Sequence, residues 1–286
     1  MKKIADLLFR LACVLGRPIH GLRPRRIYDW LARHAYPSPQ FEWYRDEWDC
    51  EMRLSPYYYL DRQIIALGSY ERDLHCYLVQ TLKPGMVALD IGANIGSITL
   101  HMARLLGNTG QVLAFEPAPP IIQRLQENVT RNNFNDRITI FNFALADTEG
   151  SMELAYADIN TENQGMGSLT NNNNEVVTLT CTVQVRRLDD MALDLARCDL
   201  IKIDIQGAET AFLKGAGLFL KRFKPKILME ISETELKCIG STSRQLCELI
   251  ESLDYKIYTL NGVPILTCNV MEDFEASSVL CIPITN

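Results

Sequence analysis

Apolar and polar positions follow one pattern before about residue 86 and another after it. Residues 4–15 carry apolar side chains at helical spacing, which predicts an amphipathic helix. Residues 36–60 are rich in Pro, Tyr and Trp, which favours an irregular connector. The next helical pattern covers residues 71–82 and stops before Lys83-Pro84-Gly85, a sequence that ends helices.

From residue 86 onwards, short apolar runs alternate with helical patterns. The runs at Val87–Ile91, Val112–Phe115 and Ile138–Ala144 predict strands. Helices are predicted between them, over Ser97–Leu106 and Pro119–Asn132. This alternation favours a mostly parallel sheet with helices on both faces, which is the α/β class.

The alternation breaks between residues 151 and 187. Segments 151–156 and 176–187 have alternating apolar positions, which predict two strands. A polar stretch that includes Asn171–Asn174 separates them. We predict a β-hairpin insertion with a mobile tip, because long polar loops lie at the surface.

The alternation resumes at Leu200. Further strands are predicted at Leu200–Ile205, Lys226–Ile231, Lys256–Leu260 and Ser278–Ile284, with helices over residues 208–222 and 241–253. No helix separates the last two strands, so we expect them to pair antiparallel at the sheet edge. The predicted organisation is an extension over residues 1–60 and one α/β domain over residues 61–286.

The net charge of −6 is unevenly distributed along the 286 residues. Residues 1–34 contain eight Lys or Arg and two Asp, about +6, which leaves about −12 on the remainder. An acidic body without a basic stripe excludes a nucleic acid as substrate. The basic arm is expected to pack on this body, to make a peripheral contact with an anionic membrane, or to form a dimer through residues 4–15.

Nine cysteines are scattered along the chain without a CxxC pair or a Cys/His cluster, so no metal site is predicted. Their odd number and spacing favour free thiols in a reducing compartment, and we expect a cytoplasmic protein. No apolar run approaches the roughly 18 residues of a membrane-spanning helix. A transmembrane segment is therefore not expected.

The first chemical motif is Asp90-Ile91-Gly92-Ala93-Asn94-Ile95-Gly96, which follows a predicted strand and opens a predicted helix. Gly92 allows a tight turn, and Gly96 allows a close approach at the helix start. Glu116 ends the next strand, where a carboxylate can accept hydrogen bonds from both hydroxyls of a ribose. The predicted cofactor-binding residues of this region are Asp90, Gly92, Ala93, Asn94, Gly96 and Glu116.

The glycine spacing separates two cofactors that contain such a ribose. Dinucleotides favour G-x-G-x-x-G, which lets the backbone approach a pyrophosphate, whereas this chain has G-x-x-x-G. Asp90, just before the first glycine, suits the ammonium and sulfonium groups of S-adenosylmethionine, which is therefore the predicted cofactor. Asp147, after the third strand, is interpreted either as a partner of the adenine amino group or as an ordinary turn residue.

The second motif covers residues 201–209. Lys202 lies within a strand that should be covered on both faces, and a buried lysine needs a charged partner. Glu230 on the neighbouring predicted strand and Asp90 are the two candidates. Asp204 stands where the strand ends and should face the ligand cleft. A purely structural ion network is the alternative interpretation.

Together these motifs resemble the FkbM-like methyltransferase family. The resemblance covers about residues 60–235 and rests on Gly68-Ser69-Tyr70-Glu71, Lys83-Pro84-Gly85, Asp90–Gly96, Phe115-Glu116-Pro117, Ala144-Leu145-Ala146-Asp147, Arg187-Leu188-Asp189-Asp190 and Ile201–Glu209, with Leu213, Gly215 and Ala216 beyond. One departure is Gln206, which stands where the family usually has a glutamate. An amide cannot act as a base.

The resemblance implies a class I methyltransferase fold with a seven-stranded, Rossmann-like sheet whose last strand is antiparallel. It also implies S-adenosylmethionine as donor and a hydroxyl of a sugar, glycan or natural product as acceptor. For this O-methylation we predict Asp204 as general base, with Lys202 and Glu230 orienting it or the acceptor. Two alternatives stay open: an NAD-dependent oxidoreductase, and a catalytically degenerate methyltransferase fold that serves as a binding subunit.

Overall fold

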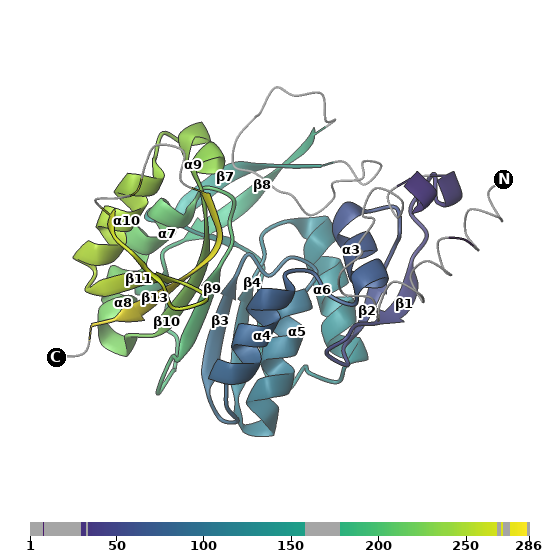
Figure 1. The fold of residues 1–286 in the computed structure, drawn as a ribbon, viewed down its shortest axis with the longest axis horizontal. Coiled ribbons are helices and arrows are strands. Elements are labelled where there is room, and N and C mark those ends of the chain that lie inside the picture. The colour runs from purple at the N-terminus through teal and green to yellow at the C-terminus, as the bar shows by residue number, and fades with distance from the viewer. Residues whose placement is uncertain are drawn as a thin grey trace.

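Strands from both halves of the chain form one eight-stranded mixed sheet (Figure 1). The computed structural model describes Leu8, residues 30–32, 34–157 and 178–267, Val270 and residues 275–284. The strands run in the order β12 (Pro264–Ile265), β11 (Tyr255–Thr259), β13 (Glu275–Pro283), β10 (Lys226–Ser232), β9 (Leu200–Ile203), β3 (Val87–Ile91), β4 (Gln111–Phe115) and β5 (Ile138–Phe141). The predicted α/β class is confirmed.

The strands from β10 to β5 are parallel, and β13 is antiparallel to both of its neighbours. The predicted antiparallel pairing of the last two long strands is therefore confirmed, but β13 lies between β10 and β11 instead of at the edge. Three consecutive buried residues, Val279, Leu280 and Cys281, suit a strand covered on both faces. The two-residue β12, which the sequence did not indicate, adds an eighth strand beside β11.

Helices cover both faces of the sheet. One face carries α3 (Tyr59–Leu67), α4 (Arg72–Thr81), α5 (Ser97–Leu106) and α6 (Pro119–Arg131), and the other carries α7 (Glu209–Gly215), α8 (Gly217–Phe223), α9 (Glu233–Cys238) and α10 (Ser243–Ser252). Figure 1 shows α4 and α5 in front of β3 and β4. Strand side chains alternate between the two apolar clusters, with Ala88 and Leu200 in the first and Leu89 and Ile201 in the second.

Several element bounds differ from the prediction for local reasons. The helix predicted over residues 208–222 is divided into α7 and α8 on either side of Ala216, whose φ of −120° is not helical. The short α9 was not predicted, because six residues are too few to show a helical period. Two short 3-10 turns are η1 (Gly107–Thr109) and η2 (Leu188–Asp190).

A separate three-stranded sheet contains the predicted hairpin insertion. Its strands run in the order β6 (Ala144–Leu145), β8 (Thr178–Arg186) and β7 (Gly150–Ala157), and β7 and β8 are antiparallel. The predicted single strand 138–144 is therefore wrong at its end: β5 stops at Phe141, and β6 belongs to the small sheet. The predicted tip, including Asn171–Asn174, lies outside the described residues.

The segment predicted as an irregular connector forms a hairpin instead. Its strands, β1 (Glu42–Arg45) and β2 (Glu51–Leu54), pair antiparallel. Long-range contacts fix the hairpin on α6: the Arg53 amide donates to Asn128 Oδ1 at 2.7 Å, and β2 shares the first apolar cluster. Strands of four residues carry too little alternation for the sequence to reveal them. The division at residue 60 stays a prediction.

The predicted amphipathic helix 4–15 lies outside the described residues apart from Leu8. Among the described helices, none is both long enough and apolar enough to span a bilayer. Seven of the nine cysteines fall within the described ranges, and each of these has a free thiol.

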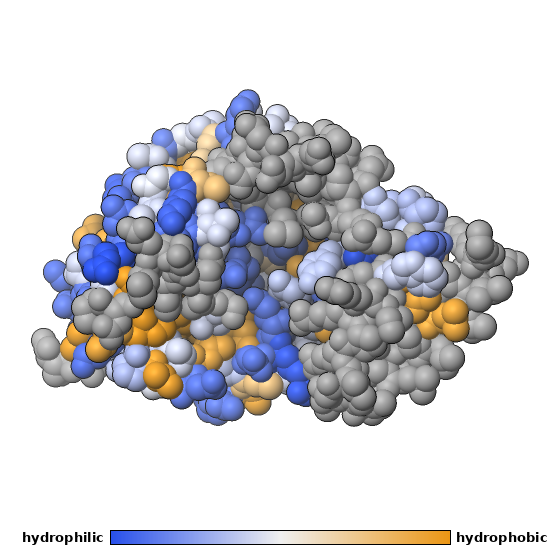
Figure 2. Space-filling model, turned by 45° about the horizontal axis from the view of Figure 1, so that its top comes forward, coloured by the Kyte–Doolittle hydropathy of each residue, from blue (hydrophilic) through white to orange (hydrophobic). Residues whose placement is uncertain are grey.

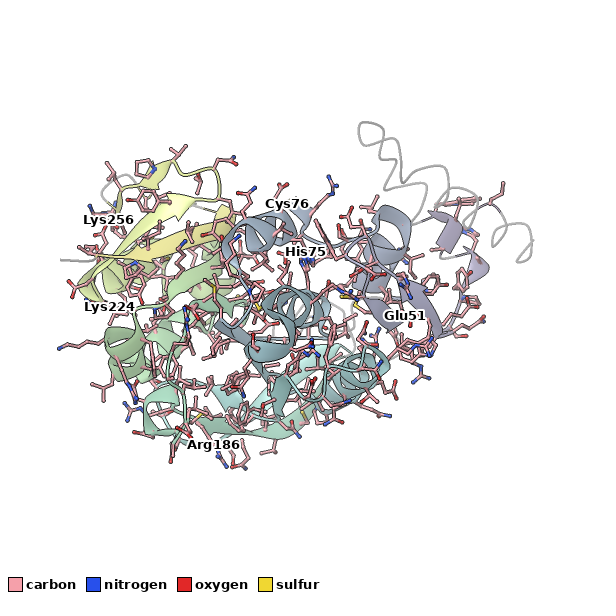
Figure 3. The ribbon with its side chains drawn as sticks, turned by 90° about the horizontal axis from the view of Figure 1, so that it is seen from below. Glu51, His75, Cys76, Arg186, Lys224 and Lys256 are labelled. Carbon is pink, nitrogen blue, oxygen red and sulfur yellow. The ribbon has the colours of Figure 1, made fainter. Side chains whose placement is uncertain are left out.

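A buried pair of histidines joins α4 to α5. The Nδ1 atoms of His75 and His101 lie 2.7 Å apart, so one ring must donate and the other accept. Trp48, in the turn between β1 and β2, stacks on both rings with centroid distances of 5.2 and 4.7 Å. Figure 3 shows His75 on α4 at this junction. Burial lowers the pKa of His75 to about 3 and that of His101 to about 4.

This pair should make the stability of the fold sensitive to acid. A histidine whose folded pKa lies below its unfolded value near 6.5 stabilises the fold fully above that pH, and the contribution is lost as the pH falls towards the folded pKa. His75→Phe leaves His101 without its partner, so the variant should be less stable at neutral pH by about 1–3 kcal/mol. The difference in unfolding free energy between the wild type and His75→Phe, measured by urea titration, should narrow as the pH falls from about 6.5 to about 4. The exposed His34→Phe is the control, and an equally narrowing difference there would contradict the assignment.

Candidate active site

The loop between β3 and α5 packs closely against the loop that follows β9. Gly92 has φ +79°, and a Cβ at this position would lie 1.9 Å from the carbonyl oxygen of Asp204. Because β3 and β9 are paired neighbours, their carboxyl ends place these two loops side by side. The strand order reverses between β3 and β9: β4 and β5 lie on the β3 side, and β10 lies on the β9 side. Open α/β sheets bind ligands at such switch points.

Glu116, directly after β4, is held by the same loop. Its Oε2 accepts a hydrogen bond from the Asn94 amide at 2.9 Å, and its Oε1 accepts one from the Ala118 amide at 2.9 Å. Burial raises the pKa of this carboxyl to about 7, although both backbone bonds favour the ionised form. Each oxygen keeps a second lone pair, so the carboxylate can still accept bonds from a ligand diol.

These loops border a mostly apolar cleft at the carboxyl ends of β3, β4 and β9. The cleft is lined by Ile91, Gly92, Asn94, Phe115, Glu116, Pro117, Ala118, Ile121, Phe143, Ala144, Leu145, Ala146, Met152, Leu154, Asp204, Ile205, Gln206 and Ala208. Figure 2, which brings the upper edge of Figure 1 forward, shows hydrophilic residues in the central hollow of the molecule. Aromatic walls beside one carboxylate fit a nucleoside, which has an apolar base and a ribose diol.

The predicted cofactor residues fall into two groups. Gly92, Asn94 and Glu116 border the cleft, whereas Ala93 and Gly96 shape the loop without lining it. Asp147 is exposed, and only its neighbour Ala146 reaches the cleft, so the predicted contact with adenine stays a prediction.

Asp90 requires a correction. Its carboxylate is expected from the sequence to face the charged groups of the cofactor, but the side chain is fully buried beneath the loop. Its Oδ2 accepts a hydrogen bond from Thr99 Oγ1 at 2.5 Å. The register of the sheet explains the position, because Asp90 is still inside β3 and stands opposite Lys202.

Lys202 connects Asp204 to the loop between β3 and α5, residues 92–96, which we call the cofactor loop. Its ammonium donates to the Gly92 carbonyl at 3.0 Å and lies 3.5 Å from Asp90 Oδ1 and 3.4 Å from Asp204 Oδ2. Burial opposes the charge of the lysine, but Asp204, Asp90 and Glu71 raise its pKa above the usual value. Lys202 is therefore a permanent cation that fixes the loop and orients the Asp204 carboxylate.

The predicted ion pair between Lys202 and Glu230 is wrong, and Asp90, the second candidate, is a partner instead. Lys202 stands opposite Leu228 in the pairing of β9 with β10. Glu230 is two residues further along β10, beyond the end of β9, so its carboxylate does not reach the ammonium.

Glu230 nevertheless shares a second, smaller pocket with Lys202. This pocket is lined by Glu71, Leu74, Lys202, Ile203, Asp204, Leu228, Met229, Glu230 and Ser278. Asp204 borders both this pocket and the cofactor cleft. Burial and then repulsion by Asp204 raise the pKa of Glu71 to about 7 and that of Glu230 to about 8.

Glu71 lines this pocket, although reasoning from the sequence did not assign it to the site. It is the N-cap of α4, and its only signal was its place in Gly68-Ser69-Tyr70-Glu71. Glu209, in the first turn of α7, fixes the turn after β9, because its Oε1 accepts hydrogen bonds from the backbone amides of Ile205 and Gly207.

Comparison with known proteins identifies the family. The model of the methyltransferase FkbM domain matches residues 90–257, more than half of the chain. The chain therefore belongs to the FkbM methyltransferase family and contains a methyltransferase domain of the class that uses S-adenosylmethionine. This assignment leaves the oxidoreductase alternative without support.

Similar proteins are known from fungi and bacteria. Methyltransferase sdnD of Sordaria araneosa is 28% identical over 49% of this chain and 64% of its own length. The AMB antimetabolite synthetase AmbE of Pseudomonas aeruginosa is 30% identical over 70% of this chain and 10% of its own length. The chain thus spans less than two thirds of these relatives. Among solved structures, methyltransferase FkbM from Methylobacillus flagellatus KT aligns at 17% identity and a TM-score of 0.43, over 97% of this chain and 60% of that chain.

The close contact at Gly92 gives a stability prediction. Gly92→Ala combines a left-handed backbone with a clash against the Asp204 carbonyl, whereas Gly240 and Gly262 have similar φ values of +77° and +81° and open space around them. Gly240→Ala and Gly262→Ala should each cost about 1–2 kcal/mol. Gly92→Ala should lower the melting temperature further than either control. An equal fall of the melting temperature in all three variants would contradict the close contact between Gly92 and the Asp204 carbonyl.

Glu116 gives a binding prediction. Glu116→Ala should weaken S-adenosylmethionine at least about tenfold in calorimetric titrations, because hydrogen bonds to a charged group are lost. Wild-type affinity should also fall as the pH drops below about 7, where the carboxyl becomes protonated. The exposed Glu149→Ala is the control. Unchanged affinity in Glu116→Ala would remove Glu116 from the cofactor site.

Proposed function

We propose that the chain transfers a methyl group to a hydroxyl oxygen of a sugar, glycan or natural-product acceptor, and that it acts in the cytoplasm. The observation that carries this proposal is the position of Asp204, which borders both the cofactor cleft and the second pocket. A group in this position can contact an acceptor whose hydroxyl points towards the donor.

The bound donor supplies a methyl group on a positively charged sulfur. The chain must bring the acceptor oxygen into line with that carbon, because correct positioning lowers the activation barrier by up to roughly 7–11 kcal/mol in favourable cases. The carboxylates of Glu71, Asp204 and Glu230 border the second pocket, where they can accept hydrogen bonds from hydroxyls of an acceptor.

Asp204 is the proposed general base. Its side chain is 32% exposed, so an acceptor hydroxyl can reach the carboxylate and transfer its proton there. Lys202 holds the same carboxylate from the buried side at 3.4 Å. Gln206 also borders the cofactor cleft, but its amide cannot take a proton, which leaves the task to Asp204.

The acidic pocket also supports an acceptor other than nucleic acid. Glu71, Asp204 and Glu230 would repel a phosphate backbone. We also propose that residues 4–15 contact a membrane or a second copy of the chain. This part of the proposal does not rest on the active site.

Asp204→Asn should lower kcat by about 10²–10⁴-fold, since it removes the base. The affinity for S-adenosylmethionine should stay close to that of the wild type. The measurement is release of S-adenosylhomocysteine with a panel of sugar and natural-product alcohols, and the exposed Asp194→Asn is the matched control. A full rate in Asp204→Asn would show that Asp204 is not the base. No methyl transfer to any alcohol in the panel by the wild type would count against the acceptor class.

A further inference from the structure

Asn128 is a fully buried polar side chain that connects two separate parts of the chain. It lies on α6, against which β2 packs (Figure 1). Its Oδ1 accepts a hydrogen bond from the Arg53 amide of β2 at 2.7 Å, and its Nδ2 donates one to the Ile95 carbonyl of the cofactor loop at 2.8 Å. A backbone amide only donates and a carbonyl only accepts, so both bonds require this orientation of the side-chain amide. Asn128 therefore joins the β1–β2 hairpin to the cofactor loop.

The Ile95 carbonyl belongs to the turn that holds Glu116. The Ile95 amide donates to Asn94 Oδ1 at 2.7 Å, and the Asn94 amide donates to Glu116 Oε2 at 2.9 Å. Asn94 has a left-handed backbone, with φ +50°, a conformation that persists only where the surrounding structure enforces it. A continuous path of bonds thus runs from Asn128 to Glu116 through two residues of the loop.

α6 also supports the cofactor loop by packing. A Cβ at Gly96 would lie only 2.6 Å from Leu125 Cδ1, so the backbone of the loop is in close contact with this leucine. Leu125 and Asn128 are three residues apart and therefore share one face of the helix. The apolar contact limits how closely the loop approaches α6, and the hydrogen bond of Asn128 fixes the direction of the peptide group.

Asn132, four residues after Asn128, provides a comparison within the same helix region. Its Oδ1 accepts from the Glu51 amide at 2.9 Å, and its Nδ2 donates to the Glu51 carbonyl at 2.7 Å and to the Asn128 carbonyl at 2.8 Å. These bonds attach β2 to α6, as the bond from Arg53 to Asn128 does. The Nδ2 of Asn128 is directed to the cofactor loop instead, and attachment of the hairpin does not account for that bond.

We propose that Asn128 is a positioning residue for S-adenosylmethionine. It acts through the cofactor loop: its bond to the Ile95 carbonyl fixes the turn, and the Asn94 amide then holds Glu116 Oε2 in place for the ribose diol. A loop that is already ordered in the free chain loses less conformational entropy when the cofactor binds. This role goes beyond methyl transfer to a hydroxyl, and it does not depend on the identity of the acceptor.

Asn128→Asp tests the bond directly. The variant keeps an oxygen that accepts from the Arg53 amide, but a second oxygen replaces the donor that faces the Ile95 carbonyl. The affinities for S-adenosylmethionine and S-adenosylhomocysteine in calorimetric titrations should fall about tenfold, because repulsion between two acceptors replaces a hydrogen bond. Asn132→Asp is the matched control. It removes the donor to the Glu51 carbonyl and should lower the urea midpoint, but both affinities should stay within about twofold of the wild type.

Glu116→Ala provides a measurement that a purely structural role would not change. If Asn128 acts through Glu116, Asn128→Asp should weaken binding less than about threefold in a chain that already carries Glu116→Ala, because the effects of coupled residues are not additive. A residue that only stabilises the fold would weaken binding by the same factor with and without Glu116.

Asn128→Ala removes the donor without burying a carboxylate, so it replaces Asn128→Asp if that variant does not fold. Four results would overturn the proposal: unchanged affinity in the folded Asn128 variant, an equal loss in Asn132→Asp, the same loss in the Glu116→Ala background, and failure of both Asn128 variants to fold while Asn132→Asp folds. A wild type that binds neither compound would overturn it together with the assignment of the cofactor.

Discussion

The buried charge of Lys202 is the constraint on which the site depends. A lysine inside a sheet loses its hydration, and Asp90 and Asp204 compensate this loss at 3.5 and 3.4 Å while the Gly92 carbonyl accepts its hydrogen bond. The three partners belong to β3, to the loop after β9 and to the cofactor loop. One ammonium therefore holds the two walls of the cleft in a fixed relation, and the carboxylate proposed as base is fixed with them.

Around this cation the fold gathers more carboxylates than it neutralises. Burial raises the pKa of Glu71, Glu116 and Glu230 to about 7, 7 and 8, so ionised carboxylates at these positions are unfavourable for the isolated fold. At Glu116 the hydroxyls of a ligand diol can supply the hydrogen-bond donors that the chain lacks there. The unfavourable electrostatics of the free chain thus become part of ligand recognition.

The sequence predicted most of the large sheet and the cofactor loop, because both depend on local signals. The strand Val87–Ile91 and the helix Ser97–Leu106 have the predicted bounds, and Gly92 takes the tight turn expected of it. It did not predict the β1–β2 hairpin or the interior position of β13. These depend on long-range pairing, which short strands do not encode in their own periodicity.

The sequence by itself determined the class of fold, the cofactor and the residues of the glycine loop, since each follows from the spacing of a few neighbouring residues. Only the tertiary structure decided which carboxylates meet Lys202 and which border the second pocket. Strand register places Asp90, and not Glu230, within reach of the ammonium. The packing of α4 brings Glu71 to the same pocket as Asp204, more than a hundred residues away along the chain, and no local pattern records this proximity.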